Sequence, residues 1–160
     1  MRIGIISDTH GQVEQTRTAV RMFESLDVQR VLHCGDIGSA EVVALFAPWP
    51  TDFVFGNTDA DQKPLRAAIE RAGKTCHGEF GDVTIEGVRI ALVHSHEPRR
   101  FSASIGSGRY QVVCYGHTHV ASIERRGDVL VINPGAVYRA KPHSVAVLDL
   151  PELAATIVEL

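Results

Sequence analysis

Cysteine is scarce in this sequence, and Cys34, Cys76 and Cys114 form no CxxC pair. An odd number of widely spaced cysteines argues against the disulfide framework of small secreted domains and fits a reducing compartment. No stretch approaches the ~20 consecutive apolar residues that a membrane-spanning helix needs. The apolar run within residues 1–6 is too short for a signal peptide. We therefore expect a cytoplasmic protein without a membrane partner.

An excess of positive charge is also lacking. The chain has 16 Lys and Arg against 19 Asp and Glu, a formal net charge of -3. No stripe of Lys or Arg with interleaved aromatic residues occurs, so a nucleic-acid partner is not expected. Any attraction for a phosphate group must be local, and bound metal ions would provide it because they are often the largest charges in a site.

The hydrophobic pattern of the 160 residues predicts one domain, residues 1–160, with a change part-way along. The first part alternates strands and helices, with strands expected over 3–7, 30–34 and 52–55 and helices over 12–26, 40–46 and 63–72. Strands dominate afterwards: a hairpin over 83–88, a strand over 89–94, a short helix over 99–105, and strands over 112–115, 121–126, 129–132, 144–150 and 154–158. Such an order can stack two sheets face to face with helices outside.

Polar clusters follow five of the predicted strands: Asp8-Thr9-His10, Gly35-Asp36, Gly56-Asn57-Thr58-Asp59, His94-Ser95-His96 and Gly116-His117-Thr118-His119. Loops at the carboxyl ends of strands are where α/β sheets build ligand sites. In an extended chain, residues i and i+2 point to one face. Two pairs with this spacing, Asp8 with His10 and His117 with His119, are therefore expected to converge on one centre. The glycines would let the backbone turn tightly beneath that centre.

The clusters offer imidazole, carboxylate and amide ligands and require no thiolate. This mixture suits Mn, Fe, Ni or Zn in five- or six-coordinate sites rather than a closed tetrahedral zinc site. Asp36 could bridge two ions ~3.5–4 Å apart. A single histidine after a strand is more often a capping or core residue than a ligand, so the prediction depends on the coincidence of all the clusters. For His33, a strand residue with a satisfied hydrogen bond is the simpler interpretation.

The motifs DTH, GD, GNTD, H and GHTH, in this order, resemble those of the calcineurin-like metallophosphoesterase superfamily, in particular its small bacterial and archaeal phosphodiesterase branch. The resemblance extends from Asp8 to the turn at 133–135. It implies an α/β fold, a four-layer αββα sandwich of two mixed β-sheets flanked by helices. It also implies two divalent metal ions, with Mn²⁺ expected first and Ni²⁺, Fe²⁺ and Zn²⁺ as alternatives.

The resemblance further implies which residues bind these ions. One ion would be held by Asp8, His10, Asp36 and His119, and the other by Asp36, Asn57, His94 and His117. Water at the ions would attack phosphorus in line, with Asp36, Asn57 and His94 as the residues most directly involved in catalysis. Asp59 resembles a residue that orients a ligand.

The sequence departs from the family pattern at two positions. Thr58 stands where many members have a histidine, and threonine cannot act as an acid near neutral pH. Phosphodiesters, which demand less protonation of the leaving group, are therefore favoured over monoesters. Ser95 stands where relatives commonly have glycine, which leaves both His94 and His96 as candidate ligands. We favour His94 because it directly ends its strand. Three roles stay open for His96: contact with a ligand residue, contact with the substrate, or no role in the site.

These observations predict a metal-dependent phosphoesterase with a dinuclear centre, acting on a small phosphate ester. A phosphomonoesterase is the nearest alternative. A non-catalytic scaffold of the same fold, as in a eukaryotic retromer subunit of the superfamily, is disfavoured because no ligand is missing. Arg99, Arg100 and Arg139 could each clamp a phosphate, although a solvated surface arginine is the simpler interpretation of each. Family members are often dimers or tetramers, so a homodimer and a homotetramer both stay open.

Overall fold

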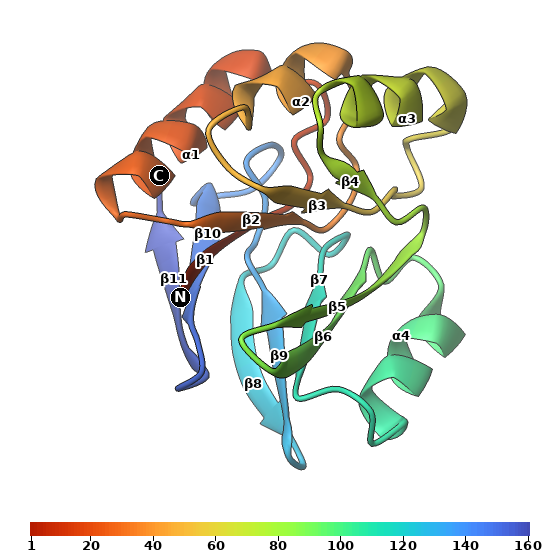
Figure 1. Cartoon of the computed structure of the whole chain (residues 1–160), viewed down its shortest axis with the longest axis vertical. Coiled ribbons are helices and arrows are strands. Elements are labelled where there is room, and N and C mark those ends of the chain that lie inside the picture. The colour runs from red at the N-terminus through yellow and green to blue at the C-terminus, as the bar shows by residue number, and fades with distance from the viewer.

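The computed structural model describes residues 1–160 and consists of two β-sheets packed face to face, with helices on the outside (Figure 1). The six-stranded sheet has the order β11-β10-β1-β2-β3-β4. Its strands are β1 (Arg2–Ile6), β2 (Arg30–His33), β3 (Thr51–Phe53), β4 (Thr75–Cys76), β10 (Ser144–Asp149) and β11 (Ala154–Glu159). The five-stranded sheet has the order β5-β6-β7-β9-β8. Its strands are β5 (Phe80–Ile85), β6 (Val88–Val93), β7 (Val112–Tyr115), β8 (Ser122–Arg126) and β9 (Val129–Asn133).

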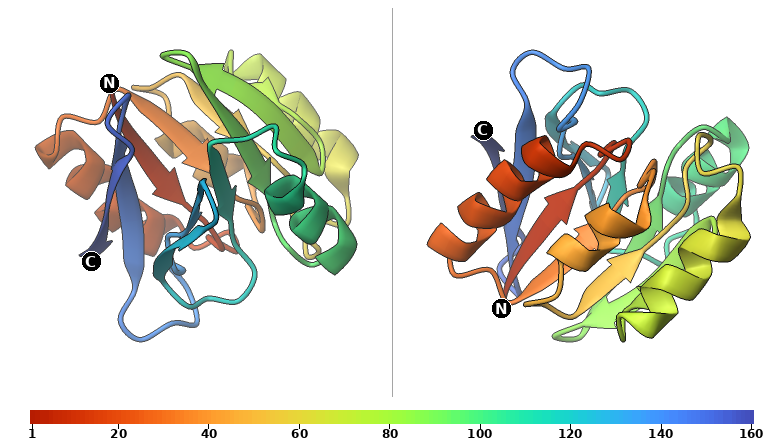
Figure 2. Two further views of the ribbon diagram at one scale, coloured as in Figure 1. Left: turned by 90° about the horizontal axis from the view of Figure 1, so that it is seen from below. Right: turned by 90° about the horizontal axis from the view of Figure 1, so that it is seen from above.

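The helices cover the outer faces of the sheets. Helices α1 (Val13–Ser25), α2 (Ala40–Leu45) and α3 (Gln62–Arg71) lie over the six-stranded sheet, as Figure 2 shows from above, and α4 (Pro98–Gly106) lies beside the five-stranded sheet. Both sheets contain parallel and antiparallel pairs, so both are mixed. The predicted α/β sandwich of two mixed sheets is confirmed. No helix is long and apolar enough to cross a bilayer.

Three layers of buried apolar side chains separate the four layers of backbone. Alternation along the strands produces them: in β1, Ile3 and Ile5 face the other sheet, whereas Ile6 faces the helices. The layer between helices and six-stranded sheet includes Phe23 and Phe53. A third layer, against α4, is formed by side chains on the outer face of the five-stranded sheet. Both faces of the central strands are therefore buried, whereas the edge strands β5, β8 and β11 have exposed residues at alternate or most positions.

Parallel pairing brings the loops that follow the strands to shared edges. Strands β1, β2 and β3 run parallel in adjacent positions, as do β6, β7 and β9 in the other sheet. The predicted clusters at Asp8, Asp36 and Asn57 consequently emerge at one edge of the first sheet. His94 and His117 emerge likewise from the second sheet.

Most predicted boundaries lie within two residues of the observed ones, and larger differences occur at two strands. Strand β4 (Thr75–Cys76) was not predicted, because two residues carry no measurable periodicity. Strand β5 begins at Phe80, three residues before the predicted hairpin, because Gly81 and Asp82 interrupt the apolar pattern while still pairing with β6. Both differences lie away from the polar clusters.

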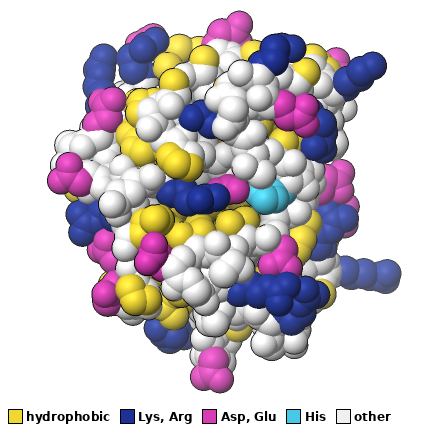
Figure 3. Space-filling model, viewed as in Figure 1, with side chains coloured by type: hydrophobic (Ala, Val, Ile, Leu, Met, Phe, Trp, Pro, Cys, Tyr) yellow, Lys and Arg dark blue, Asp and Glu magenta, His cyan; other side chains and the backbone are white.

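The surface carries charges of both signs. On the face seen in Figure 1, Lys and Arg side chains alternate with Asp and Glu, and no extended field of one sign occurs there (Figure 3). This distribution agrees with the small net charge of -3.

Phe23 of α1 provides a test of the packing between helices and sheet. Its side chain is fully buried, its ring lies edge-on 6.2 Å from Trp49, and its ring also fills the space above Gly4. We expect Phe23→Ala to lower the free energy of unfolding by about 3–5 kcal/mol, because it leaves a cavity in this layer. Urea unfolding followed by fluorescence of Trp49, the sole tryptophan, and by circular dichroism measures the change. Arg21→Ala on the exposed face of the same helix should change stability by less than about 0.5 kcal/mol.

Candidate metal centre

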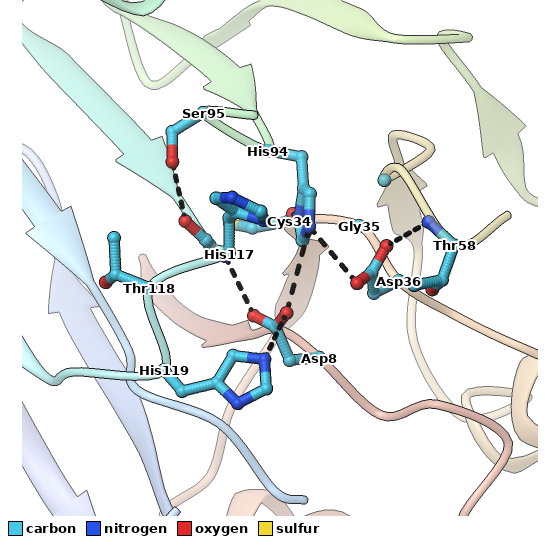
Figure 4. Close-up of polar contacts among 12 residues, drawn as sticks. Asp8, Cys34, Gly35, Asp36, Thr58, His94, Ser95, His117, Thr118 and His119 are labelled. Carbon is cyan, nitrogen blue, oxygen red and sulfur yellow. Dashed lines mark hydrogen bonds and ion pairs between the residues drawn. The ribbon is translucent and has the colours of Figure 1, made fainter. Parts of the chain in front are cut away.

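The candidate ligands lie in loops at the junction of the two sheets (Figure 4). Backbone hydrogen bonds join the loops that follow β1 and β2: Asp8 N–H donates to Gly35 O at 3.0 Å, and His10 N–H donates to Asp36 O at 2.8 Å. The His117 N–H donates to Asp8 Oδ2 at 3.1 Å and so ties the loop after β7 to the other sheet. The arrangement of the ligands is therefore fixed by main-chain contacts as well as by side chains.

Two buried carboxylates face three imidazole rings. Asp8 Oδ1 lies 3.1 Å from His119 Nε2 and 3.8 Å from both His10 Nε2 and His94 Nε2. Asp36 Oδ2 lies 3.3 Å from His94 Nε2 and 3.5 Å from His10 Nε2. Each carboxylate therefore lies within 3.8 Å of both His10 Nε2 and His94 Nε2. The ligand atoms form two groups with metal-binding spacing: Asp8 with His10 and His119, and Asp8 with Asp36 and His94.

Several of these atoms are buried without a hydrogen-bond partner. They are Asp8 Oδ1, His10 Nε2 and His94 Nε2, and each of the two nitrogens lies 3.8 Å from Asp8 Oδ1. His94 Nδ1 lies 2.7 Å from Cys34 O, so this nitrogen carries the proton and donates it to the carbonyl. In the neutral ring, Nε2 then presents a lone pair to two carboxylates. Buried acceptors facing acceptors are costly unless a cation lies between them, so the residues fit divalent metal ions.

The charges of this cluster act on its titrating groups. Burial lowers the pKa of His94, but the close approach of the Asp36 carboxylate, 3.3 Å away, and the negative charges of Asp8 and Asp36 outweigh burial, and the net pKa is raised. Burial raises the pKa of Asp36, but the nearby His94 ring and the Thr58 N–H outweigh it, and the net pKa is well below the ordinary value. Asp36 is thus held as a carboxylate, the form that binds metal.

The backbone of the ligands is left-handed at five positions. Their φ angles lie between 46° and 82°, a conformation that costs non-glycine residues on the order of 1 kcal/mol each, and the positions are Asp8, His10, Asp36, His117 and His119. The expectation that an extended chain would orient Asp8 with His10, and His117 with His119, is wrong, because the strands end before these residues. Tight left-handed turns direct the side chains instead. Ser95 also has a φ of 70°, which accounts for the glycine that relatives commonly have there.

Two glycines make room for the carboxylates. A Cβ atom at Gly56 would collide with Asp36 Oδ1 and with the Asp36 backbone nitrogen, and a Cβ atom at Gly116 would collide with the Ser7 hydroxyl and approach Asp8 Oδ2. These glycines allow close approach of two loops. The predicted tight turn applies to Gly35, whose φ is 98°, whereas Gly56 and Gly116 are needed for this close approach.

Asp59 links two of the ligand loops. Its carboxylate, 4% exposed, accepts hydrogen bonds from the Ile37, Gly38 and Gly56 N–H groups at 3.1, 3.0 and 2.9 Å. Asp59 thus joins the loop of Asp36 to the loop of Asn57. The Thr58 N–H donates to Asp36 Oδ1 at 3.0 Å, and the Thr58 side chain is exposed.

The remaining predicted residues lie around the rim. Asn57 is exposed, and its side chain makes no hydrogen bond, although both its neighbours in the chain contact Asp36. The His117 ring centroid is 5.2 Å from that of His94. His96 lies farther out, 5.6 Å from the His94 ring and 6.3 Å from the His117 ring, with Nδ1 buried and unpartnered. The structure thus places His94, not His96, against both carboxylates.

Comparison with known proteins gives the family. A model of the calcineurin-like phosphoesterase superfamily domain matches residues 1–152. The chain belongs to the calcineurin-like phosphoesterase superfamily. The resemblance seen in the motifs is confirmed, and as a member of this superfamily the protein is a metal-dependent phosphoesterase, a hydrolase.

Named relatives cover almost the whole chain. The phosphodiesterase MJ0936 of Methanocaldococcus jannaschii is 36% identical over 154 residues, with 93% of each chain covered. The probable metallophosphoesterase YsnB of Bacillus subtilis is 30% identical, covering 98% of this chain and 89% of the relative. A solved structure described as a novel archaeal phosphodiesterase superimposes with a TM-score of 0.92 and 32% identity, with both chains fully covered.

Tyr138 contacts the phosphoesterase centre but was not predicted to do so. Its ring centroid lies 5.7 Å from that of His10. The residue lies in the loop between β9 and β10, after the Asn133-Pro134-Gly135 turn, whose Asn133 side chain donates to Thr118 Oγ1 at 2.9 Å. A lone tyrosine in a loop carries no sequence signal for such a contact. Through this hydrogen bond the turn contacts the His117–His119 segment.

His33 lies beneath the centre and is satisfied by hydrogen bonds, as expected from the sequence. The Gly35 N–H donates to its Nδ1 at 3.3 Å, so Nε2 carries the proton and donates to Thr9 Oγ1 at 2.9 Å. The first bond needs an unprotonated Nδ1 and therefore the neutral ring. Burial, followed by the charge of His94, lowers the pKa of His33 to about 3.

Gly56→Ala tests the close approach to Asp36. We expect divalent-metal affinity to fall roughly 10- to 100-fold, as when a residue that orients a ligand is lost, because the new methyl group displaces the carboxylate. Titration calorimetry with Mn²⁺ measures the change. Gly106→Ala is the matched control, since nothing lies near its Cβ position and its φ is not positive. Equal affinities in the two variants would show that Asp36 tolerates the methyl group.

His33 also makes stability depend on pH. The folded protein keeps His33 neutral down to about pH 3, whereas the unfolded chain takes up a proton below about pH 6.5. Its contribution to stability is therefore complete above pH 6.5 and is lost as pH falls, by about 2 kcal/mol between pH 7 and pH 5. Urea unfolding of chelator-treated protein at several pH values should show a shallower pH dependence for His33→Gln than for wild type. Parallel curves would contradict this account.

Proposed function

We propose that this protein is a phosphodiesterase that uses two divalent metal ions, with Mn²⁺ as the first candidate, to hydrolyse a small phosphate ester. The single observation that supports it best is the convergence of Asp8 Oδ1, His10 Nε2 and His94 Nε2, all buried and without hydrogen-bond partners. The donor set of carboxylate and imidazole supports first-row ions such as Mn²⁺, Ni²⁺, Fe²⁺ or Zn²⁺.

The proposed ligands fall into two sets that share a carboxylate. Asp8, His10, Asp36 and His119 would hold one ion, and Asp36, Asn57, His94 and His117 the other. When bound, such ions lower the pKa of water and offset the charge of the phosphate. The position of Asp36 Oδ2, within 3.5 Å of both His10 Nε2 and His94 Nε2, supports its role as the shared ligand.

The chain's own contribution is to hold these ligands rigidly. The Cys34 carbonyl fixes the tautomer and orientation of His94, and the Thr58 N–H fixes one oxygen of Asp36. Asp59 holds the loop of Asn57 against the loop of Asp36 through three backbone N–H groups. Ligands that need no rearrangement bind metal in one geometry and position the reacting groups reproducibly.

Thr58 supports a diester substrate over a monoester. Its hydroxyl cannot donate a proton to a leaving group near neutral pH. An activated diester needs less protonation of the departing oxygen than an alkyl monoester. The named relative MJ0936, a phosphodiesterase, points in the same direction. We therefore propose phosphodiesters as the preferred class.

A paired assay tests the function. Protein stripped with a chelator and reloaded with Mn²⁺, Ni²⁺, Fe²⁺ or Zn²⁺ is assayed with bis-p-nitrophenyl phosphate and with p-nitrophenyl phosphate, and its metal content is measured. We expect turnover of the diester to exceed that of the monoester and to vanish after chelation. Dominant monoester turnover would overturn the diester assignment. Metal binding without turnover of either ester would favour the non-catalytic scaffold.

The Asp36→Asn variant should bind less metal, and its rate of hydrolysis should fall by more than ~100-fold. This loss is larger than the one expected when a residue that only orients a ligand is removed. The amide has the shape of the carboxylate but lacks its charge, so the comparison isolates the charge. Asp61→Asn is the matched control because Asp61 is exposed and its side chain caps no backbone group. It should retain both metal and activity.

A further inference from the structure

Tyr138 and Arg139 form a stack on the rim of the centre. The Arg139 guanidinium carbon lies 5.2 Å from the Tyr138 ring centroid. The Tyr138 ring in turn contacts the His10 ring, with the two ring centroids 5.7 Å apart. The Arg139 carbonyl also accepts a long hydrogen bond of 3.4 Å from His119 Nδ1. This two-residue segment therefore touches two candidate ligands from different loops.

The charge of Arg139 is not neutralised by the protein. No carboxylate lies within ion-pair distance of its guanidinium, and it donates no hydrogen bond. Arg100, on α4, differs in this respect: it pairs with Glu79 at 3.0 Å and with Glu97 at 3.2 Å. A positive side chain held beside the centre, exposed and unpaired, is available for an anion.

The backbone holds Arg139 in this place at some cost. Its φ is 56°, a left-handed conformation that is unfavourable for arginine and that the surrounding structure must maintain. Tyr138 is half-buried, so its ring is the fixed part of the stack. Stacking on an aromatic face restricts the guanidinium before any ligand binds, which reduces the entropy lost on binding.

We propose that Arg139 binds the phosphate group of the substrate and that Tyr138 positions it. A phosphodiester carries one negative charge over two non-bridging oxygens, and the planar fork of a guanidinium can donate to both. This inference rests on the proposed function for the identity of the substrate. It adds a side chain that recognises the anion from the His119 side of the centre. Thr58, on the Asp36 side, offers no charge.

Four variants separate recognition from structural support. Arg139→Ala removes the guanidinium, and Arg139→Lys keeps the charge but loses the fork. Tyr138→Ala removes the support, whereas Tyr138→Phe keeps the ring and loses only a hydroxyl that makes no hydrogen bond. Arg125→Ala is the control, since Arg125 is an exposed, unpaired arginine on β8.

Each variant is loaded with Mn²⁺, its metal content is measured, and hydrolysis of bis-p-nitrophenyl phosphate and binding of inorganic phosphate are compared. We expect Arg139→Ala to lower kcat/KM roughly 10- to 100-fold, mainly through KM, as for loss of one charge-assisted pair. Phosphate affinity measured by calorimetry should fall by a similar factor, with metal content unchanged. Arg139→Lys and Tyr138→Ala should be intermediate, Tyr138→Phe should lose less than Tyr138→Ala because it keeps the ring, and Arg125→Ala should match wild type.

The outcomes distinguish this inference from the proposed function. If wild type is active and Arg139→Ala behaves like Arg125→Ala, the recognition role is wrong and the phosphodiesterase stands. If Arg139→Ala loses metal, the residue supports His119 and does not bind substrate. If no metal gives wild-type turnover, the proposed function fails, while phosphate binding by wild type and Arg139→Ala still decides the role of Arg139.

Discussion

The structure depends on a concentration of negative charge and lone pairs where the two sheets meet. Asp8 and Asp36 face the ring nitrogens of His10, His94 and His119 across distances of 3.1 to 3.8 Å. This arrangement is unfavourable by itself and becomes favourable when positive charge occupies the space between the groups. The left-handed turns, the close glycines and the buried Asp59 all hold the ligands in this position. Metal binding and folding are consequently coupled, because the same contacts serve both.

The fold could be predicted from the sequence to the level of its layers. The runs that became β1, β2 and β6 are mostly apolar, because both faces of these central strands are buried, and such runs are the strongest strand signals. Helix α1 was predicted from apolar spacing near 3.6 residues. Strand β4 and the start of β5 could not be predicted, because their pairing is set by neighbours in space and not by their own residues.

The site was predictable in composition but not in geometry. The order of DTH, GD, GNTD and GHTH identified the loops, and the chemistry of carboxylate and imidazole identified the kind of ligand. The left-handed φ of residues such as Asp8 and His119 could not be predicted, because aspartate and histidine rarely adopt it without tertiary support. The contact of Tyr138 with His10 joins residues far apart in the chain and has no local signature.

Strand β1, which leads directly into Asp8, is flanked by β2 on one side and by β10 on the other. The Met1 amino group donates to the Leu150 carbonyl, and Arg2 pairs with Asp149, so the first and last parts of the chain close one sheet together. During synthesis, β1 therefore keeps an unpaired edge until residues beyond 144 have left the ribosome. All the candidate ligands emerge earlier, the last being His119. The edge of the sheet beside the strand that carries Asp8 can thus be completed only after every candidate ligand has been synthesised.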